Sequence, residues 1–177
     1  MVLVSFRPLV RADFAMLAGW LAAPHVAQWW QSSAGMDYVE QHYGPGVDGI
    51  EPSERFIIEA DGQPVGLIQR YLLGDYPEWA STLGLSEGAG IDYLIGEAEF
   101  VGRGIGSLAI RAFTATVFAR YPGASAIVAA PQQANVGSWK ALERAGFERT
   151  WAGQLASDDP SDAGPAYVYC LQRTASP

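Results

Sequence analysis

The spacing of hydrophobic residues switches repeatedly between strand-like and helix-like patterns. Short runs rich in β-branched and aromatic residues predict strands, and apolar residues three and four apart predict amphipathic helices. The predicted strands are 2–6, 55–60, 63–73, 91–95, 126–130, 147–151 and 166–173, and the predicted helices are 13–21, 36–43, 104–120 and 135–145. The order β-α-α-β-β-β-α-β-α-β-β predicts one mixed α/β domain spanning residues 1–177.

Turn residues mark the ends of these elements. Asp61-Gly62 between two apolar runs predicts a β-hairpin. Pro24 is expected to stop the first helix and Gly44-Pro45-Gly46 the second, and Gly146 fits a helix C-cap. Residues 74–90 read as a loop, and loops of that length are usually functional or disordered.

Composition restricts the classes of function. Hydrophobic residues make up 49% of the chain and charged residues 17%, which is typical of a globular protein. The single cysteine, Cys170, excludes an internal disulfide framework and a cysteine-based zinc site. No metal-binding spacing joins His25 and His42, which we expect to be structural or surface groups. We therefore expect no metal.

The charge is strongly negative. Eleven basic and nineteen acidic residues give a net charge of −8, which disfavours nucleic acid and favours a cationic partner. No apolar run reaches the roughly 18 residues of a membrane span, and no signal peptide is recognisable, so we expect a cytoplasmic protein. Residues 71–102 contain no Lys or Arg but six acids, a field that attracts a polycation unless it is simply a solvated surface.

A glycine-rich turn lies between a predicted strand and a predicted helix. Gly102, Gly104 and Gly106 leave the backbone open to a ligand, and the first N–H groups of the helix lack intrahelical partners. A pyrophosphate suits that arrangement, although a plain tight turn would look the same. The spacing matches neither the dinucleotide fingerprint nor the nucleoside-triphosphate loop.

The run from Gly90 to Phe147 resembles the GNAT N-acetyltransferases, which bind acetyl-coenzyme A. The resemblance implies the GNAT fold and this co-substrate. It implies that the preceding strand pairs with the pantetheine arm, that the glycine turn wraps the pyrophosphate, and that an asparagine at the next helix start touches the arm. The corresponding residues here are Tyr93, Leu94, Ile95, Gly102, Arg103, Gly104, Ile105, Gly106, Ser107 and Asn135. Val101 replaces the Gln or Arg usual in the family, with little expected loss because the contacts are mainly backbone N–H groups.

Nearly the whole chain is similar to one branch of that family, the aminoglycoside 6'-N-acetyltransferases. The matching segments are Arg7-Pro8-Leu9, Trp20-Leu21, Trp29-Trp30, Glu40-Gln41-His42-Tyr43, Gly66, Gly90-Ile91-Asp92, the glycine turn and Ala145-Gly146-Phe147. The resemblance implies that Asp92 lies beside the reacting amine and that Asp75 is a second carboxylate touching the substrate. It also implies that Trp29, Trp30 and Tyr43 line the sugar site.

Elementary chemistry supports a role for Asp92. An amine attacks a thioester only as the free base, and removing a proton from a lysine-like ammonium at pH 7 costs about 4.6 kcal/mol. A carboxylate can hold the ammonium and take its proton. Asp92 lies within an apolar strand, where a charge is rare unless it is paired or functional, and pairing with an arginine is the structural alternative. The two tryptophans could equally pack in the core.

Two departures from the branch concern catalysis. Ala130 stands where an acid precedes a proline, and Leu142 stands where a tyrosine is proposed to protonate the departing thiolate. Tyr121, Tyr167 or Tyr169 could substitute, or no acid is needed, because a thiol with a pKa near 8.5 leaves readily.

Three functions remain open from the sequence. The first is acetyl transfer to the 6'-amine of an aminoglycoside by direct attack in a ternary complex, which would confer antibiotic resistance. The second is acetylation of another amine, such as a siderophore hydroxylysine or a polyamine. The third is non-catalytic binding of an acyl-coenzyme A or a drug. We expect a monomer or a homodimer.

Overall fold

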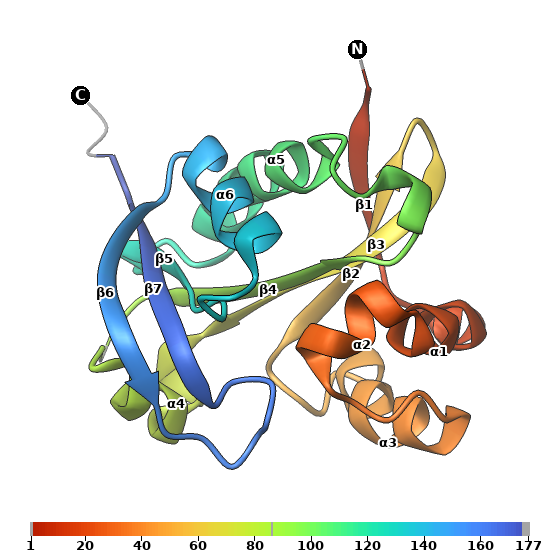
Figure 1. Ribbon diagram of the computed structural model, residues 1–177, viewed down its shortest axis with the longest axis horizontal. Coiled ribbons are helices and arrows are strands. Elements are labelled where there is room, and N and C mark those ends of the chain that lie inside the picture. Colours follow the sequence, from red (N-terminus) through yellow and green to blue (C-terminus); the bar gives the residue numbers. More distant parts are fainter. Residues whose placement is uncertain (1, 86, 175–177) are drawn as a thin grey trace.

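One mixed β-sheet runs through the computed structural model, which describes residues 2–85 and 87–174 (Figure 1). In these residues the sheet has seven strands in the order β1-β2-β3-β4-β5-β7-β6. The strands are β1 Val4–Pro8, β2 Glu54–Ala60, β3 Gln63–Leu72, β4 Ala89–Ile95, β5 Ala126–Ala129, β6 Glu148–Leu155 and β7 Gly164–Gln172. The predicted mixed α/β fold is confirmed.

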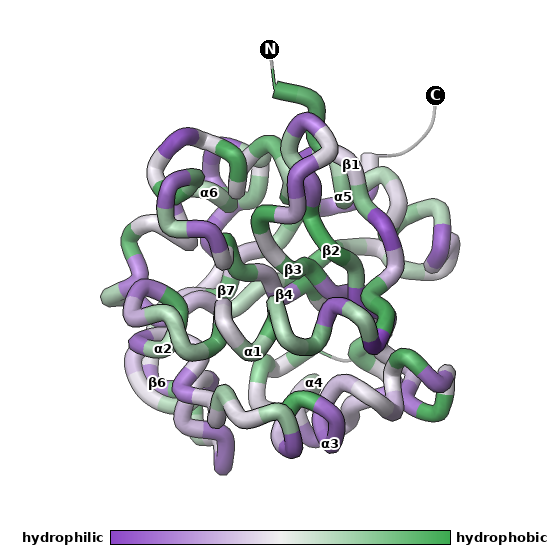
Figure 2. The backbone as a smooth tube through the Cα atoms, turned by 90° about the vertical axis from the view of Figure 1, so that its right-hand side faces the viewer, coloured by the Kyte–Doolittle hydropathy of each residue, from purple (hydrophilic) through white to green (hydrophobic). Residues whose placement is uncertain are grey.

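Helices cover both faces of this sheet (Figure 1). They are α1 Phe14–Ala22, α2 Pro24–Trp30, α3 Met36–Val47, α4 Pro77–Leu83, α5 Ile105–Arg120 and α6 Val136–Ala145, with short 3₁₀ turns η1 Arg11–Asp13, η2 Leu73–Asp75 and η3 Ala98–Phe100. One core lies between α5, α6 and the sheet, and a second lies between the sheet and α1 to α3. Figure 2 shows the hydrophobic stretches along the central strands and the hydrophilic ones in the outer connections.

The β2–β3 hairpin sets the register of the central strands. Asp61 and Gly62 have φ values of 51° and 81°, as the predicted tight hairpin turn requires. A bulge at Ile58/Glu59 then shifts the pairing by one residue, so that Arg55 lies opposite Gln69. Because a one-residue shift exchanges the two faces of a strand, the bulge decides which side chains face the site.

The structure adds two helices to the prediction and extends a third. Pro24 begins α2 as well as following α1, because proline is favoured in the first turn of a helix. α4 forms inside the expected loop, between Pro77 in its first turn and Gly84 in the left-handed conformation. α3 continues through Gly44-Pro45-Gly46 to Val47, so the expected helix end at this segment is wrong.

β4 and β5 are parallel and pair over only two positions. Ala89 lies opposite Ile127 and Gly90 opposite Val128, and beyond Gly90 the two strands have no further paired residues. The edge of β4 from Ile91 onward is therefore not covered by β5, and the gap opens toward Asp92 and Tyr93.

Candidate active site

A cleft opens where β4 and β5 separate. Its inner part is a cavity of about 220 Å³ lined by Asp92 and Tyr93 of β4, by residues 129–132 at the end of β5 and just after it, and by side chains of α2, α3 and α6. A second cavity of about 650 Å³ shares Gln69, Asp92, Asp159 and Asp162 with the first and extends to α4. The Asp92 carboxylate therefore lies where the two cavities meet.

A row of side chains across three strands holds Asp92. Arg55, Gln69 and Asp92 lie directly opposite one another on β2, β3 and β4. Gln69 Nε2 donates to Asp92 Oδ2 at 2.7 Å, and Arg55 Nε donates to Gln69 Oε1 at 3.0 Å. Burial raises the pKa of Asp92, and the hydrogen bond from Gln69, the hydroxyl of Tyr71 and the charge of Arg55 oppose that rise.

Gly90 of the Gly-Ile-Asp motif makes room for Tyr71. A Cβ at Gly90 would lie 2.2 Å from Tyr71 Cζ, so only glycine lets the ring cross the strand there. The Tyr71 oxygen accepts a hydrogen bond from Trp79 Nε1 at 3.1 Å, and its hydroxyl lowers the pKa of Asp92. The glycine thus supports the carboxylate two residues later.

Two further carboxylates reach the cleft from the β6–β7 connection. Asp159 lines both cavities, as does Asp162, whose pKa is raised to about 7 by burial and by repulsion from Asp92 and Asp159. The sequence analysis read residues 157–164 only as a polar turn. The three acids in this segment were the available signal that it could bring carboxylates to the cleft.

Trp29, Trp30 and Tyr43 all line the inner cavity, as expected for the sugar site. Tyr43 is buried, and the two tryptophans are half-buried at the end of α2. Trp30 also packs against the core formed by α1 to α3, so one side chain contributes both to that core and to the cavity wall. Asp75 is exposed at the end of η2 and lines neither cavity, so the structure does not bring it to the other site residues.

The glycine turn presents open backbone at the start of α5. Gly102 and Gly104 have φ values of +76° and +81°, and no heavy atom lies within 4 Å of a Cβ built on either. Arg103 is exposed beside them, whereas Ile105 is buried and offers only its backbone. Since the first amides of α5 have no intrahelical acceptor, this turn fits a pyrophosphate.

The remaining glycine-turn residues have structural contacts of their own. Ser107 Oγ donates to the carbonyl of Gly104 at 2.9 Å, which stiffens the turn. Gly106 faces Ala141 of α6 at ordinary van der Waals distance. These contacts occupy the Ser107 hydroxyl and one side of Gly106, whereas the first amides of α5 have no intrahelical acceptor.

The residues expected at the pantetheine arm surround the gap between β4 and β5. Tyr93 Oη lies 2.8 Å from Ser138 Oγ, and Asn135 Oδ1 accepts from Ser138 N at 3.1 Å to cap α6. His25 Nε2 lies 3.0 Å from the Ile95 carbonyl oxygen. Leu94 is buried in the opposite core, so only its backbone is available to a ligand.

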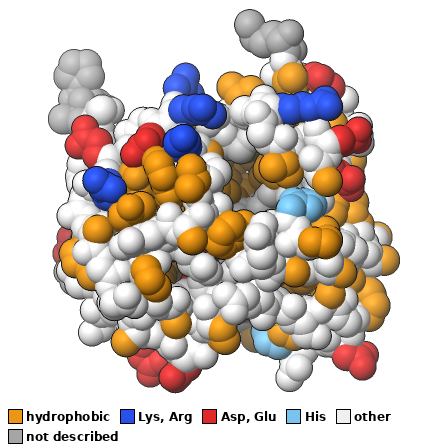
Figure 3. Space-filling model, viewed as in Figure 1, with side chains coloured by type: hydrophobic (Ala, Val, Ile, Leu, Met, Phe, Trp, Pro, Cys, Tyr) orange, Lys and Arg blue, Asp and Glu red, His pale blue; other side chains and the backbone are white. Residues whose placement is uncertain are grey.

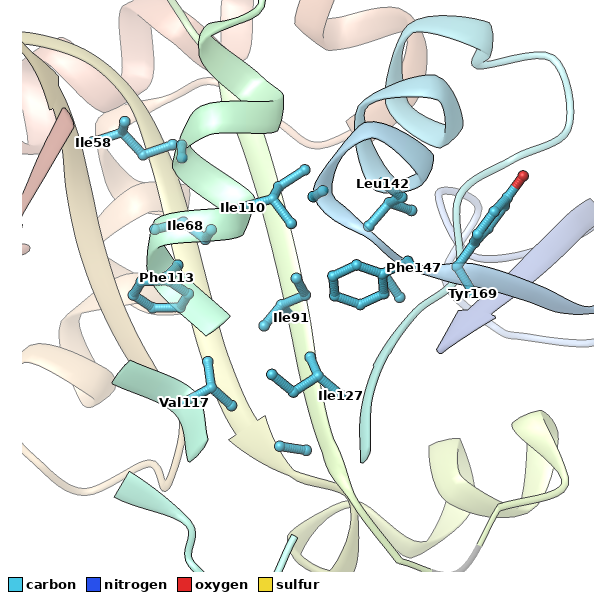
Figure 4. Packing of buried hydrophobic residues seen from close by; sticks show 14 of the residues in the cluster. Ile58, Ile68, Ile91, Ile110, Phe113, Val117, Ile127, Leu142, Phe147 and Tyr169 are labelled. Atoms are coloured by element: carbon cyan, nitrogen blue, oxygen red, sulfur yellow. The ribbon is translucent and has the colours of Figure 1, made fainter. Parts of the chain in front are cut away.

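Leu142 and Ala130, the two residues that depart from the pattern of the aminoglycoside branch, have different surroundings. Leu142 is fully buried and points into the core near Ile110 and Phe147 (Figure 4), whereas Ala130 lines the inner cavity. The suggested substitutes Tyr121, Tyr167 and Tyr169 line neither cavity; the Tyr169 hydroxyl donates to Glu143 Oε1 at 2.9 Å. The tyrosines that line the inner cavity are Tyr38, Tyr43 and Tyr93.

Charged groups are unevenly distributed on the face shown in Figure 3. The Lys and Arg side chains visible there lie in the upper half, and the lower half shows acidic side chains and a histidine but no Lys or Arg. Within residues 2–85 and 87–174, no group of three or more His, Cys, Asp or Glu side chains is arranged to hold a metal ion. No helix in this part of the chain is long and apolar enough to cross a membrane.

Comparison with known proteins agrees with this geometry. The family model described as an acetyltransferase (GNAT) domain matches residues 10–155. Aminoglycoside N(6')-acetyltransferase type 1 of Klebsiella pneumoniae is 31% identical over 173 residues, which cover 96% of this chain and 82% of that protein.

Solved structures of acetyltransferases are also similar to this fold. Aminoglycoside acetyltransferase AAC(6')-Ib in complex with coenzyme A has a TM-score of 0.77 at 28% identity, over 97% of this chain and 95% of that one. The same enzyme with coenzyme A and kanamycin has a TM-score of 0.76 at 28% identity over the same shares.

Two features together define a coenzyme A-dependent acyltransferase. They are the cleft where β4 and β5 separate within the sheet and the glycine turn before α5. The chain belongs to the GNAT acetyltransferase family, as the sequence motifs indicated, and it is an N-acetyltransferase that uses acetyl-coenzyme A as co-substrate. The predictions of family, enzyme class and co-substrate are confirmed.

Proposed function

We propose that the protein acetylates the 6'-amino group of an aminoglycoside by direct attack of the amine on the thioester. The observation that carries this proposal is the Asp92 carboxylate at the junction of two cavities, faced by Asp159 and Asp162. Its support from similarity is the 31% identity to aminoglycoside N(6')-acetyltransferase type 1.

Acetyl-coenzyme A would supply the activated acetyl group. The amides from Gly102 to Ser107 would hold its pyrophosphate, since this turn is open and its glycines adopt positive φ. The free edge of β4 at Tyr93, Leu94 and Ile95 and the side chain of Asn135 would hold the pantetheine arm, with the thioester directed toward Asp92.

The aminoglycoside would enter as a polycation. Asp92 and Asp162 would pair with its ammonium groups, Trp29 and Trp30 would contact the sugar faces, and Tyr43 would close the far wall. Asp92 would then take a proton from the 6'-ammonium, directly or through water, and pass it to solvent. The free amine forms the C–N bond and the C–S bond breaks. The nitrogen loses its second proton to Asp92 or water as the amide forms, and the departing thiolate takes a proton from solvent.

Backbone N–H groups at the unpaired edge of β4 could donate to the carbonyl oxygen as negative charge develops on it. The chain needs no tyrosine at position 142 for this sequence of events. A thiol with a pKa near 8.5 is a good leaving group at neutral pH.

A small polyamine is the second candidate substrate. Ala130 lines the inner cavity where the similar branch has an acid, which removes one negative charge from the site. A site with fewer carboxylates to pair with ammonium groups would suit a smaller amine.

A thiol-release assay tests the proposal. We expect turnover with acetyl-coenzyme A and kanamycin and none with a matched aminoglycoside that carries a 6'-hydroxyl. Asp92→Asn should lower kcat/KM about 100-fold without changing acetyl-coenzyme A affinity. Absence of thiol release with kanamycin and tobramycin at neutral and alkaline pH, together with turnover of a polyamine, would favour the second candidate.

A further inference from the structure

Arg55 of β2 is a largely buried arginine, with 11% of its side chain exposed, and it belongs to the row of side chains that ends at Asp92. Its Nη1 and Nη2 atoms donate to the Glu51 carboxylate at 3.0 and 3.2 Å. Its guanidinium also lies over the Tyr43 ring, 5.1 Å from the centroid. Because these contacts hold it on two sides, Arg55 has a fixed position beside the cleft.

The hydrogen bonds along this row have a direction. Arg55 Nε can only donate, so the Gln69 oxygen must face it, 3.0 Å away. The amide nitrogen of Gln69 must then point the other way, and it lies 2.7 Å from Asp92 Oδ2. Without the arginine the amide could turn over and present its oxygen to a carboxylate, which is repulsive.

We propose that Arg55 is a positioning residue for acetyl transfer, which acts by fixing the Gln69 amide so that its nitrogen holds the Asp92 carboxylate. The proposal rests on the function proposed above for Asp92. Arg55 lines the larger cavity but not the inner one, and its Nε atom is bonded to Gln69 rather than to Asp92. The two hydrogen bonds from Arg55 to Gln69 and from Gln69 to Asp92 are the route by which it acts on the reacting amine.

The groups around Asp92 show what the charge of Arg55 adds. Gln69 and Tyr71 face Asp92 from β3, Asp159 and Asp162 from the β6–β7 connection, Tyr43 from α3, and Tyr93 is its neighbour on β4. Arg55 is the cation among the groups that shift the Asp92 pKa, and it opposes burial and the charge of Asp159. Loss of Arg55 should therefore raise the pKa of Asp92 and leave less carboxylate at pH 7.

The first test compares Arg55→Gln with Arg70→Gln. Arg70 lies on the same hairpin, points to the other face, pairs with Glu54 at 2.6 Å and lines neither cavity. Both variants should lose stability. Only Arg55→Gln should lower kcat with kanamycin, by about tenfold or more, and raise the midpoint of the kcat/KM pH profile by on the order of one unit. The KM for acetyl-coenzyme A should stay unchanged.

Two additional variants separate orientation from charge and from folding. Glu51→Gln combined with Arg55→Gln removes the carboxylate that the single change leaves unpaired, so it should recover stability but not kcat. Arg55→Lys keeps the charge without the rigid Nε–H, so it should keep the pH midpoint near that of the wild type while kcat stays low.

A measurement without turnover distinguishes this inference from the proposed function. Carbon NMR of aspartate-labelled protein, with Asp92 assigned through Asp92→Asn, follows its carboxyl titration directly. A raised Asp92 pKa in Arg55→Gln would support the positioning role even if the wild type acetylated no aminoglycoside. If kanamycin is acetylated and Arg55→Gln matches Arg70→Gln in kcat, pH profile and Asp92 titration, the positioning role is overturned.

Discussion

Asp162 differs from an ordinary surface carboxylate because the folded protein raises its pKa. Burial and repulsion from Asp92 and Asp159 raise it from 3.8 to about 7. The folded state therefore binds this proton more tightly than the unfolded state. The resulting stability is complete below pH 3.8, is lost as the pH rises toward 7, and is absent above it.

Asp162→Asn should consequently stabilise the free protein only at higher pH. We expect a gain of about 1 to 2 kcal/mol in the free energy of unfolding at pH 8, because the variant removes a carboxylate that the fold ionises unfavourably. At pH 4 the gain should vanish, since Asp162 is already protonated in the folded state. Urea unfolding at both pH values measures this, and equal gains would contradict the assigned cause.

The same carboxylate should link substrate binding to proton release. A bound polycation favours the ionised form of Asp162, so aminoglycoside binding near pH 6 should release a proton. Calorimetry in buffers of different ionisation enthalpy detects the release, and Asp162→Asn should reduce it and raise the KM about tenfold. Asp75→Asn, which changes an exposed carboxylate outside both cavities, should do neither.

Individual site residues differed in how far the sequence predicted them. The place of Asp92 in the cleft was predictable, because a charge within an apolar strand is unusual and the Gly-Ile-Asp motif gave a reason for it. The role of Gln69 was not, because the turn at Asp61-Gly62 alone would place Arg55 opposite Ile68. The bulge at Ile58/Glu59 shifts this register by one residue, and no turn residue in the sequence marks its position.

The helices and strands around the site also differ in how far the sequence predicted them. Strands and the long helices α5 and α6 have enough periodicity to be predicted, and their order was right. α2 and α4 span only seven residues each, too few for a periodic pattern, and each begins with a proline that also reads as a breaker. Their stability comes from tertiary contacts, which a local pattern does not contain.

In the turn before α5, the left-handed backbone conformation of Gly104 should be needed for tight binding of acetyl-coenzyme A. Gly104→Ala forces a side chain into φ +81°, at a cost of about 1 kcal/mol, and places a methyl group where the pyrophosphate is proposed to lie. We expect the KM for acetyl-coenzyme A to rise about tenfold or more, with kcat at saturation little changed.

Gly49→Ala is the matched control for this change. Gly49 has φ +72° and, like Gly104, nothing within 4 Å of its Cβ position, but it lies after α3 and lines neither cavity. It should lose a similar amount of stability by thermal unfolding while the KM for acetyl-coenzyme A stays at the wild-type value. If both variants raise that KM equally, strain alone accounts for the effect.

The charge of the whole molecule should make the two substrates respond differently to salt. A net charge of −8, together with the acids around the cleft, attracts an aminoglycoside and repels the polyanionic coenzyme A. Raising the ionic strength from 0.05 to 0.5 M shortens the Debye length severalfold and weakens both effects. The KM for kanamycin should rise on the order of tenfold. The KM for acetyl-coenzyme A should change little, because screening weakens both its attraction to the glycine turn and its repulsion by the whole molecule.

A primary amine with a single charge provides the control, since its KM should move far less than that of kanamycin. Parallel shifts for the two amines would mean that the acidic cleft does not recognise the number of charges on the acceptor.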